Sequence, residues 1–215
     1  MSTCISRDVG CPQCGAISKR QMWIGIGVSA NPELRRKILN ETLFDWKCPE
    51  CGYRAQMEYP TLYHDKERQI MICLLPNGDL SSVENMADGY SQLSQVKKRL
   101  VTSLAALKEK ILIFESGLND IGVELVKLAL SELVEKKKGT KVEDGFFSMA
   151  DDSLDVIRFY YFVEGSNQPF RQGTKLDVYH KSLELVESTG FSEKNGFLQV
   201  DSALAQKILE EYQEE

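Results

Sequence analysis

The first third of the chain carries short apolar or alternating stretches that are typical of β-strands. Strands are expected over residues 19–29, 43–47, 54–59 and 69–75. Asn31, Pro32 and Glu33 form a helix start, because they supply a capping residue, a proline at the first helical position and an early acid. The pattern therefore predicts a sheet with one short helix in residues 1–75.

The middle of the chain has the spacing of helices. Apolar residues recur every three or four positions from 96 to 114, which predicts one continuous helix over this stretch. A second helix is expected to begin after Asn119, its capping residue, and to end at Gly139. The lysines at positions 136–138 suit the negative end of a helix dipole. The middle is thus expected to be a helical extension.

The last third mixes both patterns in the order β-β-(β)-α-β-α. Strands are expected over residues 146–149, 155–164 and 196–200, and helices over residues 177–188 and after Asp201. In the second of these strands, apolar or aromatic residues occupy both alternating sets of positions. Both faces of that strand are therefore expected to be covered.

Charge separates this last third from the rest. Residues 1–75 carry 10 basic and 8 acidic groups, whereas residues 145–215 carry 6 basic and 13 acidic groups. The change in composition predicts two domains, residues 1–144 and residues 145–215. The expected fold class is α+β: a zinc-ribbon-like antiparallel sheet with a helical extension, followed by a small acidic α+β module.

Composition limits the class of protein. The chain has 215 residues and a formal net charge of −6, with 42% hydrophobic and 27% charged residues, as in ordinary globular proteins. A dedicated nucleic-acid coat needs dense Lys and Arg, which this balance does not provide. The sequence has no signal-like apolar segment and no apolar run of about 18 residues. We therefore expect a cytoplasmic protein without a membrane segment, in which close cysteine pairs favour metal or redox chemistry over disulfides.

Two matching cysteine motifs carry the strongest chemical signal. They read CPQCG at residues 11–15 and CPECG at residues 48–52, with 33 residues between the pairs. In each motif, proline fixes φ at the turn and glycine permits a positive φ, so that two sulfurs can aim at one point. Two such turns would supply four thiolates in tetrahedral geometry. This set suits Zn²⁺ with no open coordination position, and also suits iron. The expected ligands are Cys11, Cys14, Cys48 and Cys51.

Other candidate residues are fewer. Two redox dithiols are an alternative for the cysteine pairs, although a thioredoxin-like pair would open a helix. Cys4 is expected to be a free terminal thiol and Cys73 a buried apolar residue. The neighbours His64 and Asp65 could form a catalytic dyad or belong to a surface turn at the end of a strand. His180 is expected to have only a packing or solvent role.

The paired motifs, followed by EYPTLYHD at residues 58–65, resemble the CpXC domain, a prokaryotic family named for these motifs. The resemblance spans about residues 8–137. It continues through residues 71–76, 99–101, 109–111, Phe114, 117–120, Glu124 and Lys127. The family tends to an acidic pair where this chain has Asn119 and Asp120. The resemblance implies the same four cysteine ligands, and it brings no activity with it.

These observations favour a zinc-stabilised, non-catalytic module that binds a protein partner or itself. One alternative is a nucleic-acid or transcription-associated zinc ribbon, which would use the basic groups Lys19, Arg20, Arg35, Arg36 and Lys37. A second is an enzyme that uses His64 and Asp65, although no G-x-S-x-G, P-loop or H-E-x-x-H motif occurs. A third is a rubredoxin-like electron carrier with iron held by the same sulfurs.

Overall fold

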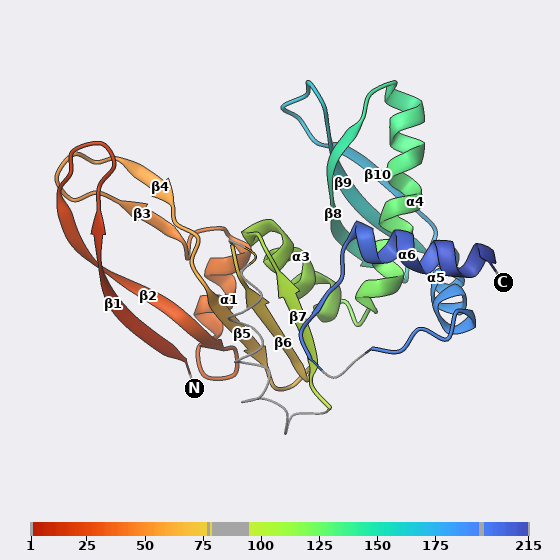
Figure 1. Cartoon of the computed structure of the whole chain (residues 1–215), viewed down its shortest axis with the longest axis horizontal. Helices are drawn as coiled ribbons and strands as arrows, with labels where there is room; N and C mark the ends of the chain where they lie inside the picture. Colours follow the sequence, from red (N-terminus) through yellow and green to blue (C-terminus); the bar gives the residue numbers. More distant parts are fainter. Residues whose placement is uncertain (1, 77, 79–94, 194–195, 215) are drawn as a thin grey trace. The chain divides into compact units, whose positions relative to one another are not determined.

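The computed structural model describes the chain except residues 1, 77, 79–94, 194–195 and 215 (Figure 1). The chain forms two compact units. The first comprises Met1–Lys108 and Asn195–Phe197, and the second comprises Glu109–Lys194 and Leu198–Glu215. The second unit thus begins at Glu109, whereas the charge pattern predicts a boundary between residues 144 and 145. The two differ because α4 packs within the second unit, as described below.

A mixed sheet forms the body of the first unit. Its strand order is β1-β2-β5-β6-β7, with parallel β2–β5 and β6–β7 pairs and antiparallel β1–β2 and β5–β6 pairs. The bounds of these strands are Thr3–Gly10, Ile17–Gly27, Thr61–Asp65, Ile70–Leu74 and Lys97–Val101. The first third of the chain is therefore strand-rich, as its pattern predicts, with β1 and β5 added.

Two further elements lie between β2 and β5. The helix α1 spans Pro32–Leu39 directly after Asn31, as predicted, and buries Leu34 and Ile38, but the Asn31 side chain makes no capping hydrogen bond and donates instead to Glu33 Oε1 at 3.0 Å. A separate antiparallel pair consists of β3, Asp45–Lys47, and β4, Arg54–Gln56. The cysteine motifs form the turns of the β1–β2 and β3–β4 hairpins, and these turns lie together at one end of the unit (Figure 1).

The predicted helix over residues 96–114 is wrong in its first part. Residues 97–101 form β7, which runs parallel to β6 from the Ile70–Lys97 pair to the Leu74–Val101 pair. Helix α3 then spans only Leu104–Glu115. A strand that is buried on both faces loses its alternation of polar and apolar residues, so pairing with a distant strand overrides the local spacing.

The second unit packs helices on one face of an antiparallel sheet. The strand order is β10-β9-β8, with bounds Phe170–Thr174, Val156–Val163 and Val142–Asp151. The helices on the sheet are α4, Asp120–Lys138, and α5, Leu176–Ser188, whereas α6, Ser202–Glu214, packs against α4; a short β11 spans Leu198–Gln199. The ends of α4 are as predicted: Asn119 Oδ1 accepts from Ile121 N, and Gly139 has a φ of 67°.

Helix α4 and the sheet share one core, in which Val126, Leu130 and Val134 belong to the same buried cluster as Phe147 and Phe159. Packing therefore joins α4 to the acidic last third, although their charges differ. Only one face of β9 is fully buried: Ile157, Phe159 and Tyr161 on this face have no exposed surface, whereas Tyr160 on the other face is 38% exposed. The expectation that both faces of β9 are covered is therefore wrong.

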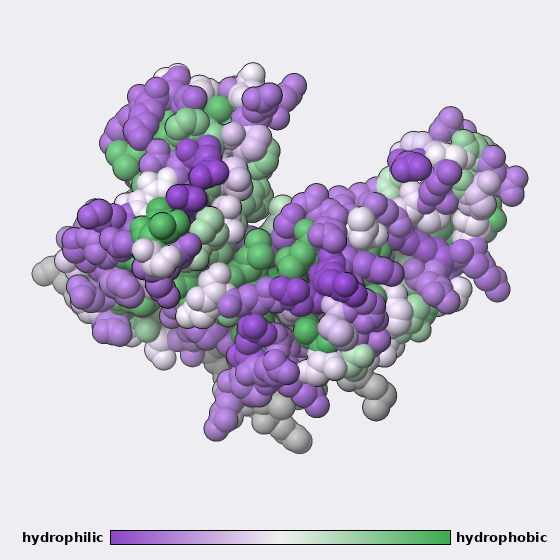
Figure 2. Space-filling view, turned by 180° about the vertical axis from the view of Figure 1, so that it is seen from behind, coloured by the Kyte–Doolittle hydropathy of each residue, from purple (hydrophilic) through white to green (hydrophobic). Residues whose placement is uncertain are grey.

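The face of the molecule seen in Figure 2 is mainly polar. In the view of Figure 2, hydrophilic residues cover most of the visible face and hydrophobic residues appear in small patches. Among the described residues, no helix combines the length and the apolar composition needed to cross a membrane.

Candidate metal centre

The first cysteine motif is a tight turn closed by its own backbone. The N–H of Cys11 donates to the carbonyl of Ala16 at 2.9 Å, and the N–H of Gly15 donates back to the carbonyl of Cys11 at 2.9 Å. Gly15 has a φ of 72°, which glycine adopts without the strain of a side chain. The turn leaves Cys11 buried and Cys14 exposed.

The second motif repeats this geometry. The N–H of Cys48 donates to the carbonyl of Tyr53 at 2.8 Å, and the N–H of Gly52 donates to the carbonyl of Cys48 at 3.1 Å. Gly52 has a φ of 75°, and Cys48 is buried while Cys51 is exposed. The two matching motifs thus form matching turns, each with one buried (inner) and one exposed (outer) cysteine.

The two turns bring four sulfurs to one point. The Sγ atoms of Cys11 and Cys51 lie 3.6 Å apart, and those of Cys14 and Cys48 lie 3.8 Å apart. All four ligand atoms lie within 4.8 Å of one another. A Zn–S distance of about 2.3 Å places the sulfurs of a regular tetrahedron about 3.8 Å apart. The four cysteines could therefore hold one metal ion.

An apolar shell surrounds the inner sulfurs. Cys11 and Cys48 form a small buried cluster with Val9 and Trp46, and Tyr53 and Met57 pack against it. This cluster is much smaller than the core of the second unit. The hairpin tips therefore have little hydrophobic burial of their own to hold them together.

The thiols influence one another's ionisation. Burial opposes ionisation of Cys11, but the backbone N–H groups of Cys14 and Gln13 outweigh it and lower the pKa of Cys11 to about 7. The N–H of Ala16 favours the Cys14 thiolate, but partial loss of hydration and the three neighbouring thiols raise the pKa of Cys14 to about 12. The neighbouring thiols thus oppose the ionisation of Cys14, and a bound cation would remove this opposition.

His64 and Asp65 do not form a dyad. They are neighbours in β5, and successive side chains of a strand point to opposite faces. Asp65 is 1% exposed and accepts from the N–H groups of Glu67 and Arg68 and from the Arg68 guanidinium at 2.8 Å. Burial lowers the pKa of His64, and nearby Lys66 acts in the same direction. Asp65 is therefore a turn-forming residue, and it is buried rather than on the surface.

The basic groups of the first unit do not share one face. Lys19 and Arg20 are successive residues of β2, so they point to opposite sides. Arg20 is 8% exposed; its guanidinium donates to the Asp45 carbonyl at 3.0 Å and lies over the ring of Tyr59. Arg20 is thus occupied in packing β2 against its neighbours. The nucleic-acid alternative loses one of its five expected phosphate contacts.

The remaining cysteines lie outside the group of four. Cys4 is exposed in β1, as expected for a free thiol. Cys73 is 1% exposed in β6, and burial raises its pKa to about 11. Cys73 therefore behaves as the small apolar residue that the sequence predicts.

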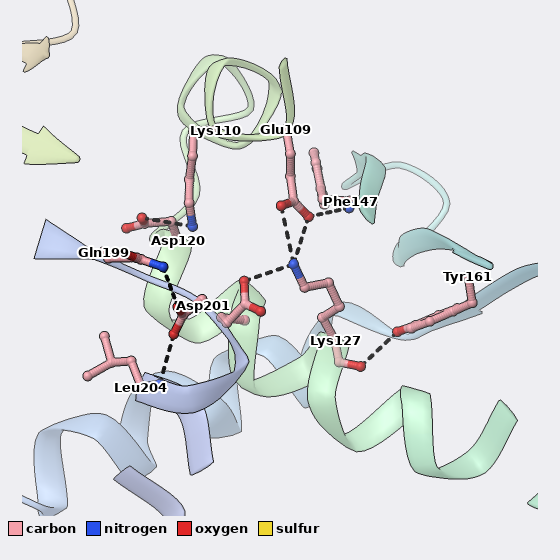
Figure 3. Close-up of polar contacts among 10 residues, drawn as sticks. Glu109, Lys110, Asp120, Lys127, Phe147, Tyr161, Gln199, Asp201 and Leu204 are labelled. Atoms are coloured by element: carbon pink, nitrogen blue, oxygen red, sulfur yellow. Dashed lines mark hydrogen bonds and ion pairs between the residues drawn. The ribbon is translucent and has the colours of Figure 1, made fainter. Parts of the chain in front are cut away.

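The second unit contains a cluster of buried charges that the sequence pattern does not reveal as a cluster. Lys127 Nζ lies 3.1 Å from Glu109 Oε1 and 2.9 Å from Glu124 Oε2, and Lys110 Nζ lies 3.2 Å from Asp120 Oδ2 (Figure 3). The side chains of all five are at most 13% exposed. These five residues, which we call the ion cluster, all fall within the stretches that resemble the CpXC family.

Backbone contacts tie the ion cluster to the sheet. Glu109 Oε1 accepts from the N–H of Phe147 in β8 at 2.6 Å, and the hydroxyl of Tyr161 in β9 donates to the Lys127 carbonyl at 2.9 Å (Figure 3). Burial raises the pKa of Glu124, although Lys127 and Lys110 oppose this shift. Burial alone would lower the pKa of Lys127, but Glu109 and Glu124 raise it. The cluster therefore keeps Lys127 charged inside the unit.

The fold and the clustered sulfurs define an α+β protein with a four-cysteine centre that could hold a metal. A family model described as CpXC protein matches residues 9–127, which is more than half of the chain. The chain therefore belongs to the CpXC family, as its motifs suggest. No curated protein and no solved structure matches it.

Proposed function

We propose that the protein is a zinc-stabilised, non-catalytic interaction module, with Cys11, Cys14, Cys48 and Cys51 as the ligands of one Zn²⁺. The observation that carries the proposal is the spacing of the four sulfurs. The Sγ–Sγ distances of 3.6 and 3.8 Å match the edges of a tetrahedron with zinc–sulfur distances.

The metal's role in this proposal is structural. Four protein thiolates complete the coordination of Zn²⁺ and leave no position for water or substrate. The hairpin tips combine short strands, β3 and β4 with three residues each, and a small apolar cluster. Metal binding would supply free energy of folding where hydrophobic burial is limited.

Zinc is preferred to iron for a reason of local architecture. A rubredoxin-like centre sits in a very small domain with an aromatic core around the iron. Here the shell of the inner sulfurs contains two aromatic residues, Trp46 and Tyr53, and the segment between the motifs contains the whole of β2, helix α1 and β3. This arrangement is closer to a zinc-ribbon pattern, in which two hairpins each supply two ligands.

A role in binding is supported by how the alternative candidate residues are used. Asp65 is engaged in a turn and Arg20 in packing, so neither the proposed catalytic dyad nor the proposed basic face is assembled. We therefore keep a protein partner or a second copy of the chain as the expected partner, in the cytoplasm.

Elemental analysis of protein purified without added metal, read beside its visible spectrum, tests the proposal. We expect one equivalent of zinc and no visible absorption. Iron with the red colour of a ferric tetrathiolate would overturn the zinc assignment. A folded protein without metal, in which these four thiols react freely with a thiol reagent, would overturn the centre itself. The exposed Cys4 provides the matched control, because a Cys4→Ser variant is expected to keep the metal.

A further inference from the structure

The three-stranded sheet of the second unit has one face turned away from the core. Cross-strand partners of an antiparallel sheet point to the same side, so the register defines this face. We call it the outer sheet face. It consists of Asp144, Phe146, Met149 and Asp151 on β8, Val156, Arg158, Tyr160 and Phe162 on β9, and Arg171 and Gly173 on β10.

Aromatic side chains occupy the centre of the outer sheet face. Phe146, Tyr160 and Arg171 form one row across the three strands. The ring centroids of Phe146 and Phe162 lie 6.1 Å apart in an edge-to-face arrangement, and both residues are partly exposed. Tyr160 is 38% exposed. An antiparallel sheet that faces water usually carries polar residues there, so this aromatic centre is unusual.

Charges on this face are separated by strand. Asp144 and Asp151 lie on β8, whereas Arg171 lies on β10 and Arg158 on the central β9. Asp144 and Arg171 are both exposed. The face therefore has two acids on one edge strand, aromatic residues at its centre and an exposed arginine on the other edge strand. Such a surface is complementary to itself.

We propose that the outer sheet face binds a second copy of itself, around a twofold axis that runs parallel to β9 and passes near Tyr160. This axis places β8 of one copy over β10 of the other. Arg171 of each copy then lies over the ring of Phe146, where a guanidinium is attracted to an aromatic face, and within reach of Asp144 two residues along the strand. An axis across the strands would instead oppose β8 to β8 and place acids together.

The inference rests on the proposed role in interaction, and it names the partner and the surface. It does not depend on the metal, because all its residues belong to the second unit. With strands about 4.8 Å apart and residues rising about 3.4 Å, the face measures roughly 14 by 23 Å. This is well below a standard interface of about 800 Å² per partner, so we expect a weak, rapidly exchanging dimer.

Sedimentation velocity over a concentration series, from about 10 μM to 1 mM protein, tests the inference. The wild type is expected to show a rising average mass with concentration. Arg171→Asp places two acids opposite each other, and Asp144→Arg places two arginines opposite each other. Each variant alone is expected to shift self-association to at least about tenfold higher concentration.

The decisive measurement mixes these two variants. In the mixed dimer the aspartate introduced at position 171 of one copy would face the arginine introduced at position 144 of the other, and the native Asp144 and Arg171 would form the second pair. An equimolar mixture is therefore expected to associate as the wild type does. Arg36→Asp on α1 is a matched control, because it removes an exposed arginine of the first unit and should leave association unchanged. Tyr160→Glu should abolish association, whereas Tyr212→Glu on α6 should not.

Three outcomes would overturn the inference: a monomer at every concentration, a mixture that associates no better than its components, or a single-stranded nucleic acid that binds this face of a monomeric protein. Metal content is measured on every sample. A zinc-loaded monomer would contradict the proposed self-association and support the metal centre. A metal-free dimer would contradict the metal centre and support the proposed self-association.

Discussion

The two units bring ionisable side chains together in different ways. In the first unit, four thiols converge from two short turns, and two of them remain exposed. In the second unit, the five charged side chains of the ion cluster are almost fully buried on α3 and α4. Both groups would be unfavourable without compensation, because thiolates in close contact repel and buried charges lose their hydration.

Each unit compensates its ionisable groups in the way that its local packing allows. The hairpin tips are small and turn-rich, so a cation between the sulfurs can replace the missing core. The ion cluster lies beside an extensive apolar core, and its members compensate one another through ion pairs and through hydrogen bonds to β8. The first unit is thus expected to depend on something outside the chain, and the second only on itself.

Removal of one inner sulfur is expected to release the metal and unfold the hairpin tips of the first unit. In Cys48→Ser, metal binding is expected to fall by at least about a hundredfold, because a hydroxyl is a poor zinc ligand and structural zinc sites contribute about 10–16 kcal/mol. Elemental analysis reports the metal, and two-dimensional amide NMR locates the damage. We expect loss of dispersed signals from residues 3–56, with signals from β8–β10 and α4 retained.

The exposed thiol Cys4 supplies the control for this change, since Cys4→Ser should retain both the metal and the NMR spectrum. A Cys48→Ser protein with a full equivalent of metal would contradict the assignment of Cys48 as a ligand. A loss of signals that extended equally to α4 would contradict the independence of the two units.

Removal of the cation at the centre of the ion cluster should break the second unit. Lys127→Met leaves Glu109 and Glu124 buried without their shared partner. Breaking a buried ion pair in this way costs about 3–5 kcal/mol of the free energy of unfolding. Urea unfolding followed by circular dichroism measures this loss, and metal content should stay unchanged.

An exposed ion pair on the same unit provides the comparison. Lys181 Nζ lies 3.4 Å from Asp177 on α5, where both side chains are more than half exposed. Lys181→Met is expected to change the free energy of unfolding by less than about 0.5 kcal/mol. Equal losses in the two lysine variants would show that burial does not set the strength of the ion cluster.

The cysteine centre could be predicted from sequence because its geometry is local. Each CPxCG motif forms its turn together with the one residue that follows it, and only the meeting of two turns depends on the fold. The ion cluster could not be predicted in this way. Lys127 and Glu109 are 18 residues apart on two helices, and both fit the polar positions of ordinary amphipathic patterns.

The strand β7 shows the same limit for the fold. Its residues 97–101 continue the apolar spacing of α3, and only the ladder with β6 makes them a strand. Capping signals are more dependable but not uniform: Asn119, Gly139 and Asp201 act where the sequence places them, whereas Asn31 precedes α1 without a capping hydrogen bond. Features that depend on adjacent residues, such as turns and helix ends, could thus be predicted from the sequence. Contacts between distant segments could not.

A smaller loss of stability than that of Lys127→Met is expected at the phenol that joins β9 to the ion cluster. Burial, together with the charges of Glu124 and Glu109, raises the pKa of Tyr161 above its ordinary value. A phenol with a raised pKa in the folded state contributes stability that is present below about pH 10 and is lost as the pH rises beyond it. In Tyr161→Phe, loss of the hydrogen bond to Lys127 should cost about 0.5–1.5 kcal/mol at pH 7.

Between about pH 9 and pH 11 the variant and the wild type should converge, because the variant has no phenol at this position to ionise on unfolding. Lys127, whose pKa is also raised, loses its contribution over the alkaline range in both proteins and so does not affect their difference. Urea unfolding at several pH values measures how the free energy of unfolding of each protein changes with pH. Exposed Tyr212→Phe is the control. If the free energies of unfolding of the two proteins change with pH in parallel, Tyr161 is not held neutral by the ion cluster. The buried charges of the second unit would then not influence this residue of its sheet.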